Sequence, residues 1–186
     1  MKVLIILLFP LLTFGQTNDR WCIEDFWKGI DTTKLYKITV YERYSMCIKQ
    51  LPDNFYQMKN LKTIYMDTET QLLLLSPKIK NFSKLEKLLI HKSNIKTLPR
   101  EIGDLKALKF LSIAWGGDLT EIPKEIGKLE KLEYLDLWRN KLTTLPEEIK
   151  NLKKLKTLRL GENQFSNSEK ERIKKLLPNC KIQFDY

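Results

Sequence analysis

The sequence has few of the residues on which reactive centres and covalent frameworks are usually built. Its 186 residues include three cysteines and a single histidine. Three cysteines are too few for a disulfide-dense scaffold, and one histidine excludes a histidine-rich metal site. The sequence contains no Gly-rich phosphate-binding loop and no Cys-x-x-Cys pair. It therefore predicts neither a metal site nor a cofactor.

Long apolar runs are also scarce, and the longest lies at the N-terminus. Residues 1–15, MKVLIILLFPLLTFG, begin with the charge of Lys2 and continue as an apolar run. This run is shorter than the roughly 20 residues that span a bilayer. It is typical of a secretory signal peptide cleaved between Gly15 and Gln16, and the alternative is a buried N-terminal strand. We expect an exported protein (periplasmic, surface-located or extracellular) without an integral membrane segment in the mature chain.

The overall composition indicates a folded, soluble chain. Hydrophobic residues make up 42% and charged residues 30% of the sequence, and the formal net charge is +10. These fractions are those of a globular protein rather than a disordered one. By length the chain is one domain.

The residues 132–154, LEYLDLWRNKLTTLPEEIKNLKK, show a pattern that fits neither a helix nor a strand alone. Its apolar positions are Leu132, Leu135, Leu137, Leu142, Leu145, Ile149 and Leu152. The first part alternates like a strand, whereas the spacing of Ile149 and Leu152 indicates a short helical or 3₁₀ turn. One such unit has a single apolar side and cannot bury it without copies of itself.

Copies of this unit fill most of the chain at intervals of 23 to 26 residues. They begin at Leu35, Leu61, Leu85, Leu108, Leu132 and Leu155. The pairs that begin at Leu98, Ile122 and Leu145 each continue as Pro-x-x-Ile-x-x-Leu. This pattern closely resembles the leucine-rich repeat family, in its 23-residue Leu-Pro-x-x-Ile class and in a bacterial exported type. A mature terminus at Gln16 is similar to exported proteins of Bacteroidota-like bacteria.

The resemblance covers residues 35–165 and implies an α/β solenoid. This fold is a horseshoe of about six repeats, in which the strands form one parallel sheet on the concave side. The family's asparagine, which hydrogen-bonds backbone in the inner turn, is present as Asn140 and Asn163. The same position in the earlier units holds Arg43, Glu69, Ser93 and Gly116. The first four units therefore depart from the family pattern at this position.

The segments on either side of the repeats are expected to cover the open ends of the solenoid. In residues 16–34, Asp19 can cap a short helix that carries several aromatic residues. In residues 166–186, Ser168 and Glu171 have the spacing of a capping box. A helix over 169–177 and a last edge strand over 181–184 should follow it.

The three cysteines lie in or near these two caps. Cys22 is in the N-terminal cap and Cys47 is in the loop of the first unit, which this cap should cover. An oxidising compartment allows them to form a disulfide. We expect Cys180 to remain an unpaired, buried thiol.

In the implied fold, the third, fifth and seventh positions of each unit, with the eighth just past the strand, face the concave groove. Aromatic and charged residues gather at these positions. We expect the partner-binding residues to be Tyr65, His91, Phe110, Trp115, Tyr134, Trp138, Arg139 and Arg159. Contiguous exposed aromatic surface usually marks a binding site. The alternative is that these side chains are cross-strand ladders that stabilise the sheet.

Three neighbouring groove residues have the types of a catalytic triad. Asp67, His91 and Ser112 are an acid, a base and a nucleophile by residue type. The diagonal from Ser112 to His91, however, separates their backbones by about 8 Å. No glycine nest or helix N-terminus offers an oxyanion hole, and the open sheet does not exclude water. The sequence predicts no catalytic residues and no enzyme.

The distribution of charge distinguishes between the possible kinds of binding partner. The concave positions carry nearly balanced charges, which argues against binding of nucleic acid there. Much of the positive excess lies in outer lysines, namely Lys128, Lys131, Lys150, Lys153, Lys154, Lys156, Lys174 and Lys175. By resemblance to the family we expect a monomer that recognises a protein partner through the concave face. The alternative is an adhesin-like module that binds an acidic polysaccharide or membrane surface through the lysine-rich outer face.

Overall fold

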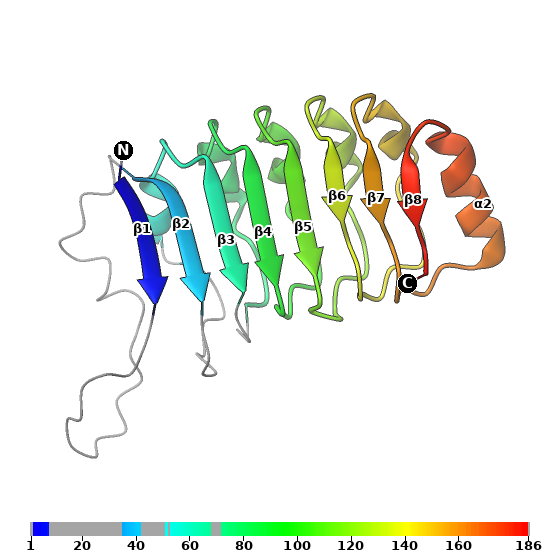
Figure 1. Ribbon diagram of the computed structural model, residues 1–186, viewed down its shortest axis with the longest axis horizontal. Helices are drawn as coiled ribbons and strands as arrows, with labels where there is room; N and C mark the ends of the chain where they lie inside the picture. The colour runs from blue at the N-terminus through cyan, green and yellow to red at the C-terminus, as the bar shows by residue number, and fades with distance from the viewer. Residues whose placement is uncertain (1, 8–34, 42–50, 52, 68–71, 186) are drawn as a thin grey trace, which may run out of the picture.

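One parallel sheet runs the length of the computed structural model, which describes residues 2–7, 35–41, 51, 53–67 and 72–185. Eight strands follow one another in the sheet in chain order (Figure 1). They are β1 (Lys2–Leu7), β2 (Leu35–Tyr41), β3 (Thr63–Asp67), β4 (Lys87–His91), β5 (Phe110–Ala114), β6 (Tyr134–Asp136), β7 (Thr157–Arg159) and β8 (Lys181–Gln183). The strands β2 to β7 belong to the six predicted units, and the solenoid is confirmed.

The register of the sheet aligns equivalent positions of successive units. Lys87 pairs with Phe110, Phe110 with Tyr134, and Tyr134 with Thr157. The residues that follow them along each strand pair in the same way. The columns predicted from the repeats are therefore the columns of the sheet.

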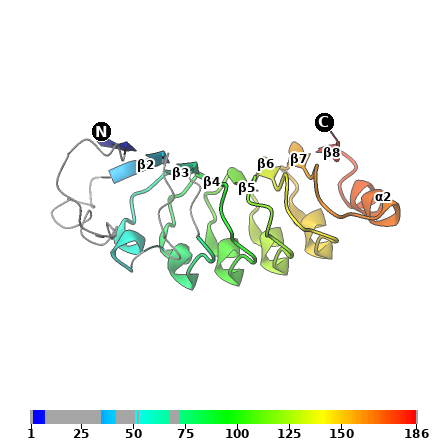
Figure 2. The same ribbon diagram turned by 90° about the horizontal axis from the view of Figure 1, so that it is seen from below.

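Short 3₁₀ helices form the opposite, convex side (Figure 2). They are η2 (Asp53–Gln57), η3 (Pro77–Asn81), η4 (Arg100–Asp104), η5 (Lys124–Lys128) and η6 (Glu147–Asn151). A proline with φ between −67° and −62° precedes each of the last three, and its ring fixes that angle. The isoleucine of the Leu-Pro-x-x-Ile motif is fully buried in all three helices. The predicted helical turn is confirmed.

The apolar positions of the repeat fill the space between the sheet and the 3₁₀ helices. Leu61, Leu85, Leu108 and Leu132 are completely buried. Neighbouring 3₁₀ helices approach closely at Gly103, where an added Cβ would lie 2.4 Å from the carbonyl oxygen of Glu125. Gly127 meets Glu148 in the same way. Any side chain at these two glycines would force adjacent units apart.

The turn after the strand has the same backbone shape in four successive units. Lys92, Trp115, Arg139 and Glu162 all have φ between 52° and 64°. The left-handed region costs a non-glycine residue roughly 1–2 kcal/mol. The N–H of Trp115 donates to the carbonyl of Trp138 (3.0 Å), and that of Arg139 to Gly161 (2.8 Å). The conformation thus extends the hydrogen-bond ladder past the end of the strand.

The predicted role of Asn140 is confirmed. Its Nδ2 donates to the carbonyls of Ile113 (2.8 Å) and Leu137 (3.0 Å), and its Oδ1 accepts from the N–H of Leu119 (3.2 Å). Asn163 makes the equivalent bonds one unit later. Each side chain therefore ties the inner turn of one unit to the unit before it.

Positive and negative residues alternate at the N-terminal ends of strands β3 to β7, one residue before each strand begins. They are Lys62, Glu86, Lys109, Glu133 and Lys156. The Nζ of Lys109 lies 2.9 Å from Glu86, and the Nζ of Lys156 lies 2.6 Å from Glu133. The pKa of Glu86 is lowered, chiefly by its hydrogen bond to Lys109. Successive units are thus joined by ion pairs as well as by the core.

The last unit is followed by helix α2 (Asn167–Leu176), which packs Ile173 into the core. The predicted capping residue is wrong by two positions. Ser166 is the N-cap, and its Oγ accepts from the N–H of Glu169 (3.2 Å). Ser168 lies inside the helix, with its hydroxyl 2.9 Å from that of Ser166. Glu169 turns to the previous unit, where it accepts from the N–H of Leu145 (3.1 Å).

Cys180 is a free thiol beside strand β8 and is half-buried rather than fully buried. Burial raises the pKa of Cys180 to about 11, so the thiol is protonated at neutral pH. Residues 16–34, Cys22 and Cys47 lie outside the described residues, so the N-terminal cap and the disulfide remain predictions.

The N-terminal segment forms the first strand of the sheet. Strand β1 pairs in parallel with β2 along residues 2–7. Removal of residues 1–15 by a signal peptidase remains a prediction. No helix within the described ranges is long and apolar enough to cross a membrane.

Candidate partner-binding face

The concave side of the sheet carries the predicted partner-binding residues, and all but one reach the surface. Trp115 and Arg139 are exposed, whereas Tyr65, His91, Phe110, Tyr134 and Arg159 are half-buried. Trp138 is buried. We call this surface the concave face. It comprises the described side chains at the third, fifth, seventh and eighth positions of the repeat units that contain strands β3 to β7.

The indole of Trp115 is exposed at the edge where the strands end. Its exposed fraction is 38%, large for an aromatic side chain. The guanidinium carbon of Arg139 lies 5.9 Å from the centroid of the Trp115 ring. Arg139 is held from its other side by Glu162, whose Oε2 is 3.4 Å from Nε. Trp115 therefore lies at the exposed end of a row formed by three successive turns.

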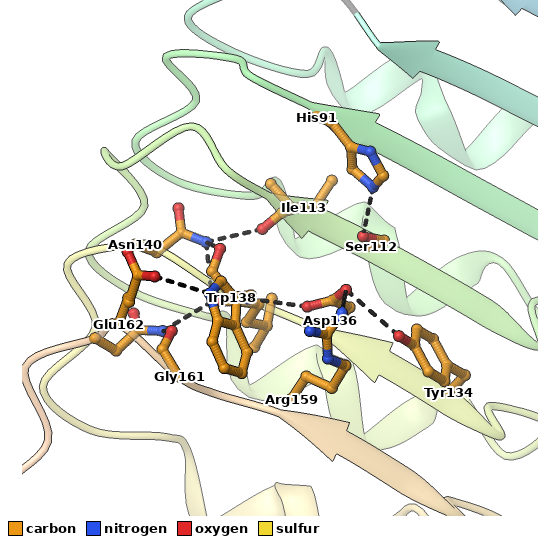
Figure 3. Close-up of polar contacts among 12 residues, drawn as sticks. His91, Ser112, Ile113, Tyr134, Asp136, Trp138, Asn140, Arg159, Gly161 and Glu162 are labelled. Carbon is orange, nitrogen blue, oxygen red and sulfur yellow. Dashed lines mark hydrogen bonds and ion pairs between the residues drawn. The ribbon is translucent and has the colours of Figure 1, made fainter. Parts of the chain in front are cut away.

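The exposure predicted for Trp138 is wrong, because its indole is only 2% exposed. It lies over Gly161 of the next unit, where an added Cβ would be 2.3 Å from Cη2 of the ring. The guanidinium carbon of Arg159 is 4.7 Å from the ring centroid. Nε1–H donates to Oε1 of Glu162 at 3.4 Å (Figure 3). A glycine in the neighbouring unit leaves space that the large ring fills.

Asp136 connects several of these side chains, as Figure 3 shows. It is 4% exposed. One oxygen accepts from the backbone N–H of Trp138 (3.0 Å), and the other from Arg159 (3.1 Å) and the hydroxyl of Tyr134 (3.4 Å). A buried carboxylate with three donors has its hydrogen-bonding capacity well satisfied. Asp136 and Arg159 thus form an ion pair between neighbouring strands.

Ring contacts continue along the third column of the sheet. The Phe110 and Tyr134 centroids are 6.1 Å apart with their planes tilted by 35°. The ammonium of Lys87 is 4.8 Å from the centroid of Phe110. These contacts are the cross-strand ladders of the alternative interpretation, yet they leave the rings half-exposed. The same side chains can therefore stabilise the sheet and meet a partner.

His91 and Ser112 do meet, despite the separation of their backbones. Nε2 of His91 is 2.9 Å from Oγ of Ser112. Asp67 lies opposite His91 on β3, but its Oδ2 accepts from the Tyr65 hydroxyl (3.4 Å) and its Oδ1 is 3.3 Å from the ammonium of Lys92.

The pair formed by His91 and Ser112 lacks the access that a nucleophile needs. Ser112 is 2% exposed, so a substrate cannot reach its hydroxyl. Burial lowers the pKa of His91, against the opposing effect of Asp67 and Asp136, so the imidazole is neutral at pH 7. The contact therefore fixes two side chains of the concave face in place.

Sequence reasoning missed a hollow at the C-terminal end of the concave face. Its volume is about 350 Å³. Trp138 borders it, together with the apolar side chains Leu160, Phe165 and Phe184 and the charged side chains Glu162, Lys170 and Asp185. The sequence indicates only a cap in residues 166–186, whereas the register of β8 on β7 extends the concave columns into them.

The outer lysines are where the sequence predicts them. Lys128, Lys131, Lys150, Lys153, Lys154, Lys156, Lys174 and Lys175 are all exposed. Within the described residues no cluster of histidine, cysteine and carboxylate side chains could hold a metal ion.

Comparisons with known proteins agree with this architecture. Residues 100–177 match a family model described as a leucine-rich repeat region. A search of curated proteins gives no match. The fold is a leucine-rich repeat solenoid, and the match to the family model supports the interpretation of this chain as a leucine-rich repeat protein.

Two solved structures show the same fold. A leucine-rich repeat protein of Leptospira interrogans is 38% identical with a TM-score of 0.71, over 82% of this chain and 38% of that one. The leucine-rich repeat domain of the type III effector XopL is 26% identical with a TM-score of 0.56, over 64% of this chain and 45% of that one. This chain thus spans less than half the length of either aligned protein.

Proposed function

We propose that this protein is a non-catalytic recognition module that binds a protein partner through its concave face. The exposed indole of Trp115, braced by Arg139, is the observation that carries the proposal. Tryptophan and arginine dominate the energetics of protein interfaces. The half-exposed rings of Phe110 and Tyr134 extend this surface across the sheet.

Capture of partners from the native host tests the proposal. Mature protein immobilised through its C-terminus would serve as bait, with Trp115→Ala and Arg139→Ala as test variants. Lys153→Glu is the matched control, because Lys153 is exposed on the outer face. We expect a partner whose affinity for the Trp115→Ala variant falls by about 2 kcal/mol in titration calorimetry, while Lys153→Glu binds like the parent protein. Equal binding by all the variants would place the interface elsewhere.

Export is part of the proposed function. It is supported by the positive start and the apolar run in residues 1–15, which have the form of a signal peptide. Intact-mass measurement on protein from its native host tests this directly. A mature mass that starts at or near Gln16 would support export, and a mass that includes residues 1–15 would contradict it.

A second candidate is adhesion to an acidic polysaccharide or membrane surface. The exposed outer lysines favour it. Salt distinguishes the candidates, because contacts made through lysines weaken steeply between low and physiological ionic strength. Contacts anchored by aromatic side chains change little over the same range.

A further inference from the structure

The hollow beside Trp138 continues the concave face beyond the last repeat. Gln183 pairs with Arg159 in the register of β8 on β7, so Asp185 extends the column that contains Trp138 and Gly161. The indole leans over Gly161, which has no side chain to fill the column. The space of about 350 Å³ between the indole and the tail is large enough for one long side chain.

The hollow has apolar walls and an excess of negative charge. Leu160, Phe165 and Phe184 form the walls, and the two rings meet edge to face at 6.2 Å. The lining includes two carboxylates, Glu162 and Asp185, and one ammonium, that of Lys170. Glu162 also pairs with Arg139, so the negative charge of Asp185 is the one left for a ligand. In the described part of the chain no ion pair involves the exposed carboxylate of Asp185.

The aromatic rings around the hollow already hold cations of the protein itself. Arg159 lies 4.7 Å from the ring centroid of Trp138, and Lys170 lies 5.5 Å from that of Phe184. Ring faces attract cations because of their negative quadrupole. The chemistry of the hollow is therefore that of a site for a positively charged group.

We propose that the hollow receives an arginine side chain of the protein partner. This proposal rests on the proposed function and names the chemistry of one contact. The aliphatic stem would pack against the half-buried ring of Phe184, and the guanidinium would lie beside Asp185 and Glu162. A planar guanidinium can stack on a ring and bond carboxylates at once, which an ammonium cannot do as well.

Lys170 lies over the ring of Phe184, so it competes with an incoming cation for that ring and repels it by charge. Its removal should therefore tighten binding of a cation, whereas removal of Asp185 should weaken it. Lys170→Gln and Asp185→Asn remove the charge and leave a polar side chain in its place. Asp104→Asn is the matched control, since Asp104 is an exposed carboxylate in η4.

The test is an NMR titration with Nα-acetyl-arginine amide, observed at the indole N–H of Trp138. Trp138→Phe assigns this signal. The neutral analogue Nα-acetyl-citrulline amide has nearly the same shape. We expect the arginine probe to shift the signal saturably and the citrulline probe to bind several-fold more weakly. Asp185→Asn should weaken the arginine probe about threefold, Lys170→Gln should strengthen it, and Asp104→Asn should leave it unchanged.

Three results would overturn the proposal. They are no saturable shift with the arginine probe, an equal response to citrulline, or binding of Nα-acetyl-glutamate amide that Lys170→Gln abolishes. The probe does not involve Trp115, so this titration is independent of partner capture. Probe binding without any captured partner would contradict the proposed function alone, and partner capture without probe binding would contradict the arginine site alone.

Discussion

The indole of Trp138 occupies the space above Gly161 that a side chain would otherwise fill. The two residues lie in the same column of the sheet, one unit apart. The ring fits only because position 161 has no side chain. The ring covers the backbone of the last repeat, and Arg159 closes over it.

Gly161→Ala should destabilise the protein, because the new methyl group would overlap the indole of Trp138. Forcing an extra carbon into a filled space costs typically about 1–3 kcal/mol. Urea unfolding monitored by circular dichroism measures the change. In the Trp138→Ala background the same substitution should be nearly harmless, and a double-mutant cycle would show the coupling. Additive effects of the two substitutions would contradict the contact.

Trp138→Ala and Trp115→Ala should differ sharply in their effects on stability. Trp138 is 2% exposed and Trp115 is 38% exposed. Removing a buried tryptophan costs about 3–5 kcal/mol, whereas removing the exposed one should cost within about 1 kcal/mol. Thermal unfolding of the two variants measures both. Similar losses would mean that the two side chains have been assigned to the wrong environments.

Leu135→Asp tests the register of the repeats. Leu135 is completely buried in strand β6, so an aspartate there would bury an unpaired charge and cost about 3 kcal/mol or more. Glu147→Lys, in the exposed helix η6, should leave the melting temperature almost unchanged. Equal shifts in the two melting temperatures would show that the register is wrong.

Stability should fall as the pH drops below the ordinary pKa of histidine. Burial lowers the pKa of His91 in the folded state, so in this range the unfolded chain binds a proton that the folded chain does not. The stability present above about pH 6.5 is therefore lost as the pH falls towards the folded-state pKa. Carboxylates with lowered pKa values, such as Glu86 and Glu169, act in the same direction at lower pH.

His91→Gln isolates this contribution, since glutamine can still reach the hydroxyl of Ser112. Urea unfolding between pH 7.5 and 5 should show a shallower pH dependence for the variant than for the parent protein. Identical slopes would show that His91 does not carry the effect.

The repeats were predictable because the leucines recur with the period of the repeat. Positions such as Leu108 and Leu132 recur at nearly constant spacing and are completely buried. The Pro-x-x-Ile motif placed η4, η5 and η6 in the same way. A strand that has one buried face also fixes its register, because a shift of one residue would expose its apolar side chains.

The concave face was less predictable, since its details depend on pairs of residues in different units. The alternation of a strand shows that Trp138 points away from the core, but not that Gly161 lets the ring lie flat against the sheet. His91 and Ser112 are in contact because their side chains extend towards each other, which the distance between their backbones does not show. The helix cap at Ser166 was missed because Ser168 with Glu171 has the same spacing as Ser166 with Glu169.

The alternating charges before each strand have a consequence for the number of repeats. Deleting one unit, residues 108–131, would place Glu86 next to Glu133, so two carboxylates would face each other where ion pairs now stand. Deleting two units together would bring Glu86 beside Lys156 and restore an attractive pair. Shortening or lengthening this protein should therefore be tolerated better in steps of two units than in steps of one. The leucines repeat every unit, but the charges repeat only every second unit.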